Sequence, residues 1–383
     1  MRVSERVRDL PPYLFAELDK RIAARRASGA DVISLGIGDP DLPTPRHVVE
    51  ALRDAAEDPT THQYPSYYGL PAFRVAIAEF YERRFGVTLD PDTEVLPLIG
   101  SKEGLAHLPI AFVDPGDEAL VPDPGYPVYA TATALAGGRP RLVPLAAETG
   151  FLPDFAAITI TDRTRLMWLN YPSNPTAAVA DLAFFDRAVA FGRWHDLLLV
   201  HDAAYSEITF DGFVAPSILQ ASGAKDIAVE FGSLSKTYNM TGWRVGYAVG
   251  SRPAIEALGT VKTNIDSGIF NAVQRAAVAA LTGPQDHVEE MRAVYQKRRD
   301  LAVGALRDGG VDVEPPVGSI YVWIPVPEGR TSAEFAGRLL DDAAVVVSPG
   351  TGYGPSGEGY VRISLTVADH RLEEAMARIR RAL

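Results

Sequence analysis

The chain has 383 residues, of which 47% are hydrophobic and 22% charged, a balance typical of a globular protein with two or three domains. Its formal net charge of -12 argues against a general nucleic-acid binder, which would carry a basic domain. The absence of cysteine excludes disulfides, thiolate metal sites and a cysteine nucleophile. Residues 1–15 lack a long apolar run, and no stretch approaches the ~18 apolar residues of a membrane span. We therefore expect a cytoplasmic protein with neither nucleic acid nor a membrane as partner.

The first two thirds of the chain predict an α/β domain. Apolar residues at helical spacing predict helices within 47–58, 70–85 and 102–113. Short apolar runs then alternate with helical or turn-rich stretches, and we expect strands at 118–122, 165–170, 197–202, 227–233 and 244–250. Several of these runs are apolar on both faces, as strands between two helix layers are. The alternation predicts a three-layer domain with a mostly parallel sheet between helices.

The pattern changes after about residue 284. Residues 285–308 predict one long, charged, amphipathic helix, and 319–326 and 359–365 predict strands that alternate more regularly. The last helix places Leu372, Met376, Ile379 and Leu383 on one face. We therefore expect a large domain over 46–283 and a smaller α+β domain over 284–383. Residues 1–45 are expected to form an arm or to belong to the small domain.

Polar side chains follow four of the predicted strands, where ligands bind in open α/β sheets. Gly100, Ser101 and Lys102 follow the run VLPLI and precede a helix, Asn170 and Asn174 follow RLMWL, and Asp202 ends LLLVH. Ser233, Ser235 and Lys236 follow IAVEF. Four such strand ends indicate one shared site.

These residue types suit pyridoxal 5′-phosphate. Backbone N–H groups of residues 100–102 at a helix start attract an anion, and Ser233, Ser235 and Arg244 can add hydroxyls and a cation to the same phosphate site. Lys236 then stands where a Schiff-base lysine must stand.

The remaining polar and aromatic groups can hold the cofactor ring. Asp202, at the end of a buried strand, can pair with the pyridinium nitrogen and keep the ring an electron sink. Asn174 and Tyr205 can hydrogen-bond the phenolic oxygen, and Tyr126 in DPGYPVY offers a flat face for stacking. Arg362 in VRISL shares a strand face with Ser364, and a bidentate guanidinium there can clamp a substrate α-carboxylate.

Each residue also has an ordinary structural interpretation. A lone lysine such as Lys236 is usually a solvated charge, Asp202 can cap a helix, and Arg362 is most often half of an ion pair. The competing motifs are weak. The S-x-x-K pattern at 233–236 lacks its S-D-N and K-T-G companions, and GYGPSG at 352–357 is followed by a strand where a dinucleotide motif needs a helix. No histidine spacing predicts a metal site.

The chain resembles the class I/II aminotransferases of fold type I, the aspartate aminotransferase-like pyridoxal-phosphate enzymes. The resemblance runs from about residue 8 to the C-terminus and is carried by SLSKTYNMTGWRVGY, NYPSNPT, DAAYSE, GSKEGL, DPGYPVY and VRISL. It implies transamination between an amino acid and a 2-oxo acid, with Lys236, Asp202 and Tyr205 as catalytic residues. It assigns cofactor contacts to Ser101, Lys102, Tyr126, Asn174, Ser233, Ser235 and Arg244, and a substrate contact to Asn174 and Arg362.

The same resemblance implies a homodimer. Tyr64 in HQYPSYYG matches a tyrosine that reaches the phosphate of the other subunit, so the two active sites would be shared. Ala177 departs from the pattern, because the family usually has glycine in NPTG, and we expect a small local backbone adjustment there.

A finer resemblance, carried by LPPYLF, SLGIGDPDLPTP and VKTNIDSGIF, is to the LL-diaminopimelate aminotransferases of lysine biosynthesis and their near relatives. It implies LL-diaminopimelate and 2-oxoglutarate as substrates, with Tyr13 and Gly38 near the substrate. An aminotransferase for aspartate or a broader range of amino acids, a pyridoxal-phosphate lyase and a non-catalytic cofactor-binding regulator remain as alternatives.

Overall fold

Seven strands form the central sheet of this computed structural model, which describes residues 2–8, 10 and 14–383. Their order is β2-β8-β7-β6-β5-β3-β4, with β2 at Val95–Leu98, β3 at Glu118–Asp123, β4 at Arg139–Pro144, β5 at Thr164–Asn170, β6 at Leu198–Asp202, β7 at Ala228–Ser233 and β8 at Gly246–Gly250. The pairings from β4 to β7 are parallel, whereas β8 is antiparallel to both of its neighbours. The prediction of a mostly parallel sheet is confirmed.

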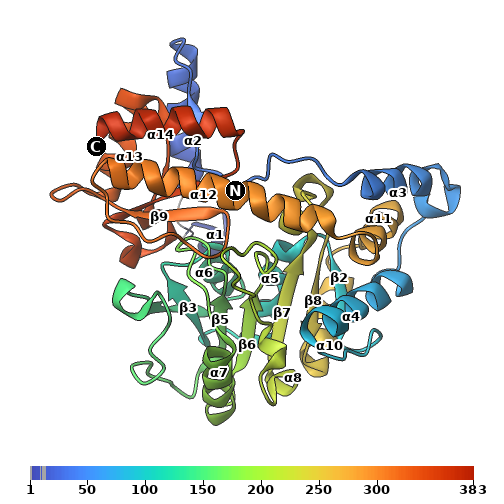
Figure 1. Ribbon diagram of the computed structural model, residues 1–383. Coiled ribbons are helices and arrows are strands. Elements are labelled where there is room, and N and C mark those ends of the chain that lie inside the picture. The colour runs from blue at the N-terminus through green and yellow to red at the C-terminus, as the bar shows by residue number, and fades with distance from the viewer. Residues whose placement is uncertain (1, 9, 11–13) are drawn as a thin grey trace.

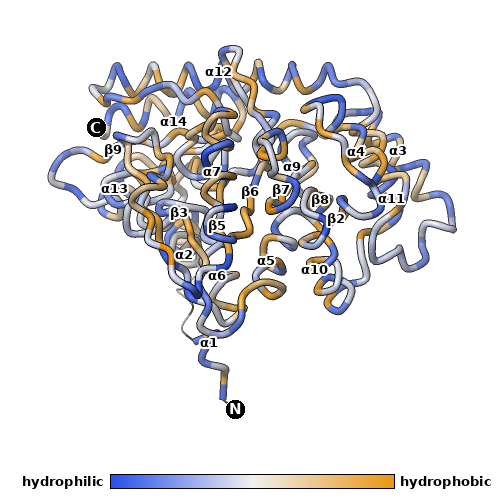
Figure 2. The backbone as a smooth tube through the Cα atoms, turned by 90° about the horizontal axis from the view of Figure 1, so that it is seen from below, coloured by the Kyte–Doolittle hydropathy of each residue, from blue (hydrophilic) through white to orange (hydrophobic). Residues whose placement is uncertain are grey.

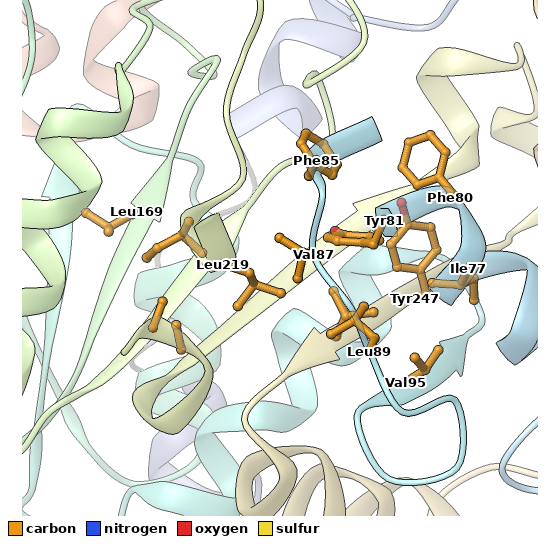
Figure 3. Close-up of a cluster of buried hydrophobic side chains, with 14 of the residues drawn as sticks. Ile77, Phe80, Tyr81, Phe85, Val87, Leu89, Val95, Leu169, Leu219 and Tyr247 are labelled. Carbon is orange, nitrogen blue, oxygen red and sulfur yellow. The ribbon is translucent and has the colours of Figure 1, made fainter. Parts of the chain in front are cut away.

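Helices cover both faces of this sheet, because its central strands are apolar on both sides. On one face, α5 (Ser101–Phe112), α6 (Val128–Leu135) and α10 (Arg252–Thr263) pack over alternate strand residues such as Trp168 and Phe231. On the other face, α3 (Arg46–Glu57), α4 (Pro71–Phe85), α7 (Leu182–Trp194) and α11 (Asn271–Thr282) share a core with the intervening residues. Figure 3 shows part of this second core, where Tyr81 and Phe85 lie near Tyr247 of β8. The three-layer α/β fold class is confirmed.

Two smaller sheets, built mostly from the C-terminal part of the chain, lie within the described residues. Strands β11 (Ser348–Pro349), β12 (Tyr360–Ser364) and β9 (Tyr321–Pro325) are antiparallel, and β1 (Ile33–Ser34) pairs in parallel with β10 (Val345–Val346). Helices α12 (Asp286–Asp308), α13 (Ser332–Ala343) and α14 (Asp369–Ala382) pack with them in one core. The long α12 extends from this core across the large sheet (Figure 1), and it alternates between polar and apolar residues along its length (Figure 2). The exact boundaries at 45/46 and 283/284 remain a prediction.

The remaining elements are short or peripheral. They are α1 (Glu5–Arg8), α2 (Leu14–Ala27), α8 (Ala224–Ile227), α9 (Leu234–Thr237) and the 3₁₀ helices η1 (Pro59–His62), η2 (Ala147–Thr149), η3 (Ile218–Gln220), η4 (Thr241–Trp243), η5 (Gly350–Tyr353) and η6 (Pro355–Gly357). Within the described residues, none of the helices combines the length and the apolar character needed to cross a membrane.

The register of the large sheet aligns its polar strand ends. Asn170 of β5 lies opposite Asp202 of β6, and Asp202 lies opposite Phe231 of β7. Because parallel strands end at the same edge, the segment after β7, which carries Lys236, begins beside both residues.

Candidate active site

Two asparagines join the ends of β5 and β6. The Asn170 Nδ2 donates to the Asp202 carbonyl at 2.7 Å, and the Asn170 Oδ1 accepts from the Asn174 backbone N–H at 2.8 Å. Both asparagines are buried. Asn170 therefore fixes the chain path that brings Asn174 to the same edge as Asp202.

Asp202 is a buried carboxylate with only neutral hydrogen-bond donors. The Tyr129 hydroxyl donates to its Oδ2 at 2.8 Å and the Ala204 N–H to its Oδ1 at 3.2 Å. Burial raises the pKa of Asp202, and these two donors oppose the effect only in part. Tyr129 is itself stacked on Trp168 at 4.9 Å between ring centroids, so its hydroxyl is held in place. A protonated pyridine nitrogen would give this carboxylate a charged hydrogen-bond donor in addition to the two neutral donors among the described residues.

Lys236 lies on α9, directly after β7. Its Nζ donates to the Gly38 carbonyl at 2.6 Å. Burial lowers the pKa of Lys236, and the nearby Arg362 and Arg244 lower it further, against the opposing effect of Tyr321 and Asp39. A neutral amine is therefore favoured at this position, which is the form that acts as a nucleophile or a base.

The start of α5 and Arg244 meet at one corner of the site. Gly100 precedes α5 with φ of 75°, and a Cβ there would lie 2.3 Å from the Arg244 Nη2. A Cβ at Gly246 would lie 2.7 Å from the Ser101 backbone nitrogen. Arg244 itself has φ of 54°, a conformation that costs about 1–3 kcal/mol in a non-glycine residue. Glycines thus let a guanidinium and helix N–H groups converge, as phosphate binding requires.

The two serines and Lys102 contribute differently to this corner. The Ser233 Oγ accepts from the Ser235 N–H at 3.2 Å, so it caps α9. Ser235 is buried. The Lys102 ammonium lies 6.0 Å from the ring centroid of Tyr126, which places it over the predicted stacking residue.

Arg362 extends from β12 into the same region and is only 3% exposed. Its Nη1 donates to the Asn174 Oδ1 at 2.6 Å and its Nη2 to the Gly36 carbonyl at 2.7 Å. The guanidinium lies 3.9 Å from the ring centroid of Tyr321 and 4.8 Å from that of Tyr353. Its partners in the described structure are neutral, so the ordinary interpretation as half of an ion pair is wrong.

Three tyrosines that the motifs did not single out belong to this region. Tyr129 donates to Asp202, Tyr353 covers one face of Arg362, and the Tyr321 hydroxyl lies 3.0 Å from that of Tyr205. Tyr129 follows Tyr126 by three residues, a helical spacing that signals a shared face. The positions of Tyr321 and Tyr353 depend on the pairing of β9, β11 and β12, for which the sequence offers no comparable signal.

The remaining predictions concern Tyr64, Tyr13 and Ala177. Tyr64 is 87% exposed, and Tyr13 lies outside the described residues. Ala177 has φ of 59°, so the alanine occupies the left-handed conformation that favours glycine.

Another polar cluster contains Glu103, His107 and Asp266, whose ligand atoms are close enough to hold a metal ion. The buried Lys262 ammonium already donates to Asp266 at 2.6 Å and to Glu103 at 3.5 Å, so the cluster is better described as a half-buried ion-pair network.

The residues at the main site fit pyridoxal phosphate on their own chemistry. Within the described residues, the buried carboxylate of Asp202 accepts hydrogen bonds from neutral groups, a buried lysine is biased toward its neutral form, and an exposed arginine and helix N–H groups converge at a glycine-lined corner. The buried Arg362 offers a bidentate fork to a carboxylate.

Comparison with known proteins agrees with this geometry. Residues 30–379 match the family model described as aminotransferase class I and II. The chain is 56% identical over 385 residues to the LL-diaminopimelate aminotransferase of Moorella thermoacetica, covering 100% of this chain and 99% of the relative. Its structure resembles substrate-bound BacF from Bacillus subtilis, with a TM-score of 0.95, 40% identity and coverage of 100% and 98%. It also resembles a single mutant of Thermus thermophilus aspartate aminotransferase, with a TM-score of 0.94, 32% identity and full coverage of both chains.

Proposed function

Because the chain belongs to the aminotransferase class I and II family and is a pyridoxal-phosphate-dependent aminotransferase, we propose that it moves an amino group from LL-diaminopimelate to 2-oxoglutarate, in lysine biosynthesis. The observation that carries this substrate assignment is the 56% identity, over the whole length of both chains, to a relative that bears that name. A cytoplasmic location remains a prediction.

In the proposed reaction Lys236 performs two tasks. When bound, pyridoxal phosphate supplies an electron sink for the bond broken at the substrate Cα. The Lys236 Nζ would hold the cofactor covalently and would accept the proton from the substrate Cα. Both tasks require a neutral amine, and burial shifts the pKa of this lysine downward, in the direction of that form.

Asp202, Asn174 and Tyr205 would hold the cofactor ring. Asp202 would pair with the ring nitrogen and keep it protonated, which its burial and neutral donors favour. Asn174 and Tyr205 would hydrogen-bond the phenolic oxygen, and Tyr126 would stack on the ring. At the other end, Ser101, Ser233, Ser235 and Arg244 would surround the phosphate, together with the main chain of Lys102.

Arg362 would bind the α-carboxylate. Its guanidinium is already oriented by Asn174, by the Gly36 carbonyl and by two flanking rings, so little side-chain entropy is lost on binding. Gly38, which accepts from Lys236, would line the substrate space.

A homodimer with shared sites is the assembly we propose. Tyr64, Tyr67 and Tyr68 are exposed, and Ile265 and Phe270 on the neighbouring segment are exposed as well. A Cβ at Gly268 would lie 3.0 Å from the Ser66 carbonyl oxygen, so the two segments adjoin. Such an apolar surface is typical of a protein–protein interface, and Tyr64 lies within it.

Mixing two defective variants tests the shared site. Tyr64→Ala and Lys236→Ala should each lose transamination activity when assayed alone. Subunit exchange between the two variants should restore one intact site per hybrid dimer, with Lys236 from one subunit and Tyr64 from the other. Activity that stays at the sum of the two separate preparations would argue against Tyr64 acting on the partner subunit.

The substrate proposal is tested by a donor–acceptor screen of the holoenzyme. LL-Diaminopimelate, aspartate and aromatic amino acids are each paired with 2-oxoglutarate, and formation of the new oxo acid is followed. We expect the highest kcat/KM with LL-diaminopimelate. A preference for aspartate or aromatic donors would contradict the substrate, and amine release without an oxo acid acceptor would indicate a lyase.

A further inference from the structure

Tyr321 lies where three of the predicted active-site groups meet. It is the first residue of β9 and only 3% exposed. Its hydroxyl is 3.0 Å from the Tyr205 hydroxyl, and the two rings meet edge to face with centroids 5.7 Å apart. Its own ring lies flat enough against Arg362 to bring the guanidinium carbon within 3.9 Å of its centroid. One side chain therefore contacts both the predicted phenolic-oxygen ligand and the predicted carboxylate clamp.

The same hydroxyl also borders the backbone that holds Lys236. A Cβ at Gly38 would lie 2.0 Å from the Tyr321 Oη, so this oxygen is packed against the Gly38 Cα. The Gly38 carbonyl accepts from the Lys236 Nζ at 2.6 Å. Tyr321 thus fixes the spacing between the residue 38 backbone and the segment that carries Tyr205.

We propose that Tyr321 is a positioning residue for transamination: its hydroxyl donates to the Tyr205 oxygen and its ring holds the Arg362 guanidinium. This inference rests on the proposed function. A phenol oxygen that accepts one hydrogen bond becomes a better donor of its own proton. Tyr205, with its oxygen occupied by Tyr321, would therefore give a directed and strengthened hydrogen bond to the phenolic oxygen of the cofactor.

The ring of Tyr321 has a separate task. A guanidinium stacked on an aromatic face is attracted by the ring quadrupole and restricted to one plane. That plane decides whether both Nη groups of Arg362 face a carboxylate together. The hydroxyl should therefore affect the cofactor, and the ring should affect substrate binding.

Several elements place titratable or charged groups near Tyr321, and a change in any of these groups would also shift a pH profile. The titratable and charged groups that interact with it are Tyr205 after β6, Lys236 of α9, Tyr295 of α12 and Arg362 of β12, and Asp39, Asp202 and Tyr353 interact with these groups. Removing only the hydroxyl leaves all of these groups in place, which makes Tyr321→Phe the informative change.

The first experiment measures the midpoint of the pH-dependent absorption change of bound cofactor in the holoenzyme. Loss of a donor to the phenolic oxygen leaves more negative charge beside the lysine-linked nitrogen, which then keeps its proton to higher pH. We expect Tyr321→Phe to raise the midpoint by about half a pH unit, as a fraction of one hydrogen bond implies. Tyr205→Phe should raise it further, and the double variant should match Tyr205→Phe alone because Tyr321 acts through Tyr205.

The second experiment separates ring from hydroxyl by steady-state kinetics. Tyr321→Phe keeps the ring, so the KM for the amino donor should stay near the wild-type value while kcat falls. Tyr321→Leu removes the ring, and KM should rise roughly 3- to 30-fold. Tyr171→Phe is the matched control, since it deletes another buried tyrosine hydroxyl, which donates to the Phe151 carbonyl at 3.0 Å. It should change neither midpoint nor KM.

Failure of the positioning role and failure of the proposed function give different experimental results. A wild-type protein that binds no pyridoxal phosphate would contradict the proposed function itself. The positioning role would be overturned if the wild-type holoenzyme turns over normally but Tyr321→Phe leaves the absorption midpoint unchanged or lowers it. It would also be overturned if the midpoint shifts of Tyr321→Phe and Tyr205→Phe add up in the double variant. If Tyr321→Leu does not fold, the Phe variant and the double variant still decide.

Discussion

Replacing Arg362 by lysine tests the carboxylate clamp while keeping the positive charge. The guanidinium offers two Nη donors, now at 2.6 Å from the Asn174 Oδ1 and 2.7 Å from the Gly36 carbonyl, and it is stacked between Tyr321 and Tyr353. An ammonium cannot reproduce this planar fork.

The size of the effect follows from the lost donor. A hydrogen bond to a charged group contributes about 1.5–3 kcal/mol, so losing one of the two bonds to a substrate carboxylate should raise the KM for the amino donor about 10- to 150-fold. The same rise is expected for the 2-oxo acid, because both substrates carry the carboxylate. Cofactor affinity and the absorption spectrum should change little, since Arg362 is not among the residues that we place around the cofactor.

Steady-state kinetics with both substrates, together with cofactor titration of the apoenzyme, measures these quantities. Arg371→Lys is a suitable control, because Arg371 is paired with Asp31 at the surface of the C-terminal helix. The reasoning would be refuted by an Arg362→Lys variant whose two KM values stay at the level of this control, or by one that loses cofactor affinity while its KM values are unchanged.

Three further predictions concern stability. Burial lowers the pKa of Lys236 below its ordinary 10.5, so between the folded-state pKa and pH 10.5 the unfolded chain binds more protons than the folded one. The apo form of Lys236→Met should therefore unfold at a higher temperature than the apo wild type at pH 7. Thermal scans at several pH values should show this difference in unfolding temperature narrowing as the pH approaches 10.5. Glu230 accepts from Tyr81, Ser217 and His201 in the core, and Glu230→Gln should cost about 3–5 kcal/mol in chemical denaturation at pH 7. Burial opposes ionisation of Glu230, but its hydrogen bonds, led by that from His201, lower its pKa below 4.5. The difference in unfolding free energy between wild type and Glu230→Gln should therefore persist above pH 4.5 and shrink at lower pH. A difference that does not change with pH would contradict the role of ionised Glu230. Ala177→Gly should stabilise the protein by about 0.5 kcal/mol, because relief of the left-handed strain exceeds the added chain entropy, and an equal loss would show that the alanine methyl contributes packing instead.

Local patterns predicted the edge of the sheet at which the site lies. Buried strands read as apolar runs, and the polar residues that follow them must lie at one edge when the strands are parallel, so Asn174, Asp202 and Lys236 could be grouped from the sequence. The observed register, in which Asn170 lies opposite Asp202, agrees with that grouping. The three-layer architecture followed from the same apolar runs.

The sequence did not indicate the contacts that depend on long-range pairing. Tyr321 and Arg362 come together only through the antiparallel register of β9 and β12, in which Trp323 lies opposite Arg362. No periodicity within either strand encodes that register. Tyr64 is exposed in the single chain, so its proposed role depends on a second copy.

The most direct test of the account is chemical identification of the lysine that carries the cofactor. The holoenzyme is reduced with borohydride, digested, and the peptide bearing the pyridoxyl group is identified by mass spectrometry. We predict a single modified residue, Lys236, whose Nζ now donates to the Gly38 carbonyl, and no adduct in Lys236→Ala. Modification of Lys102, which lies over Tyr126, or of any other lysine in place of Lys236 would contradict the account.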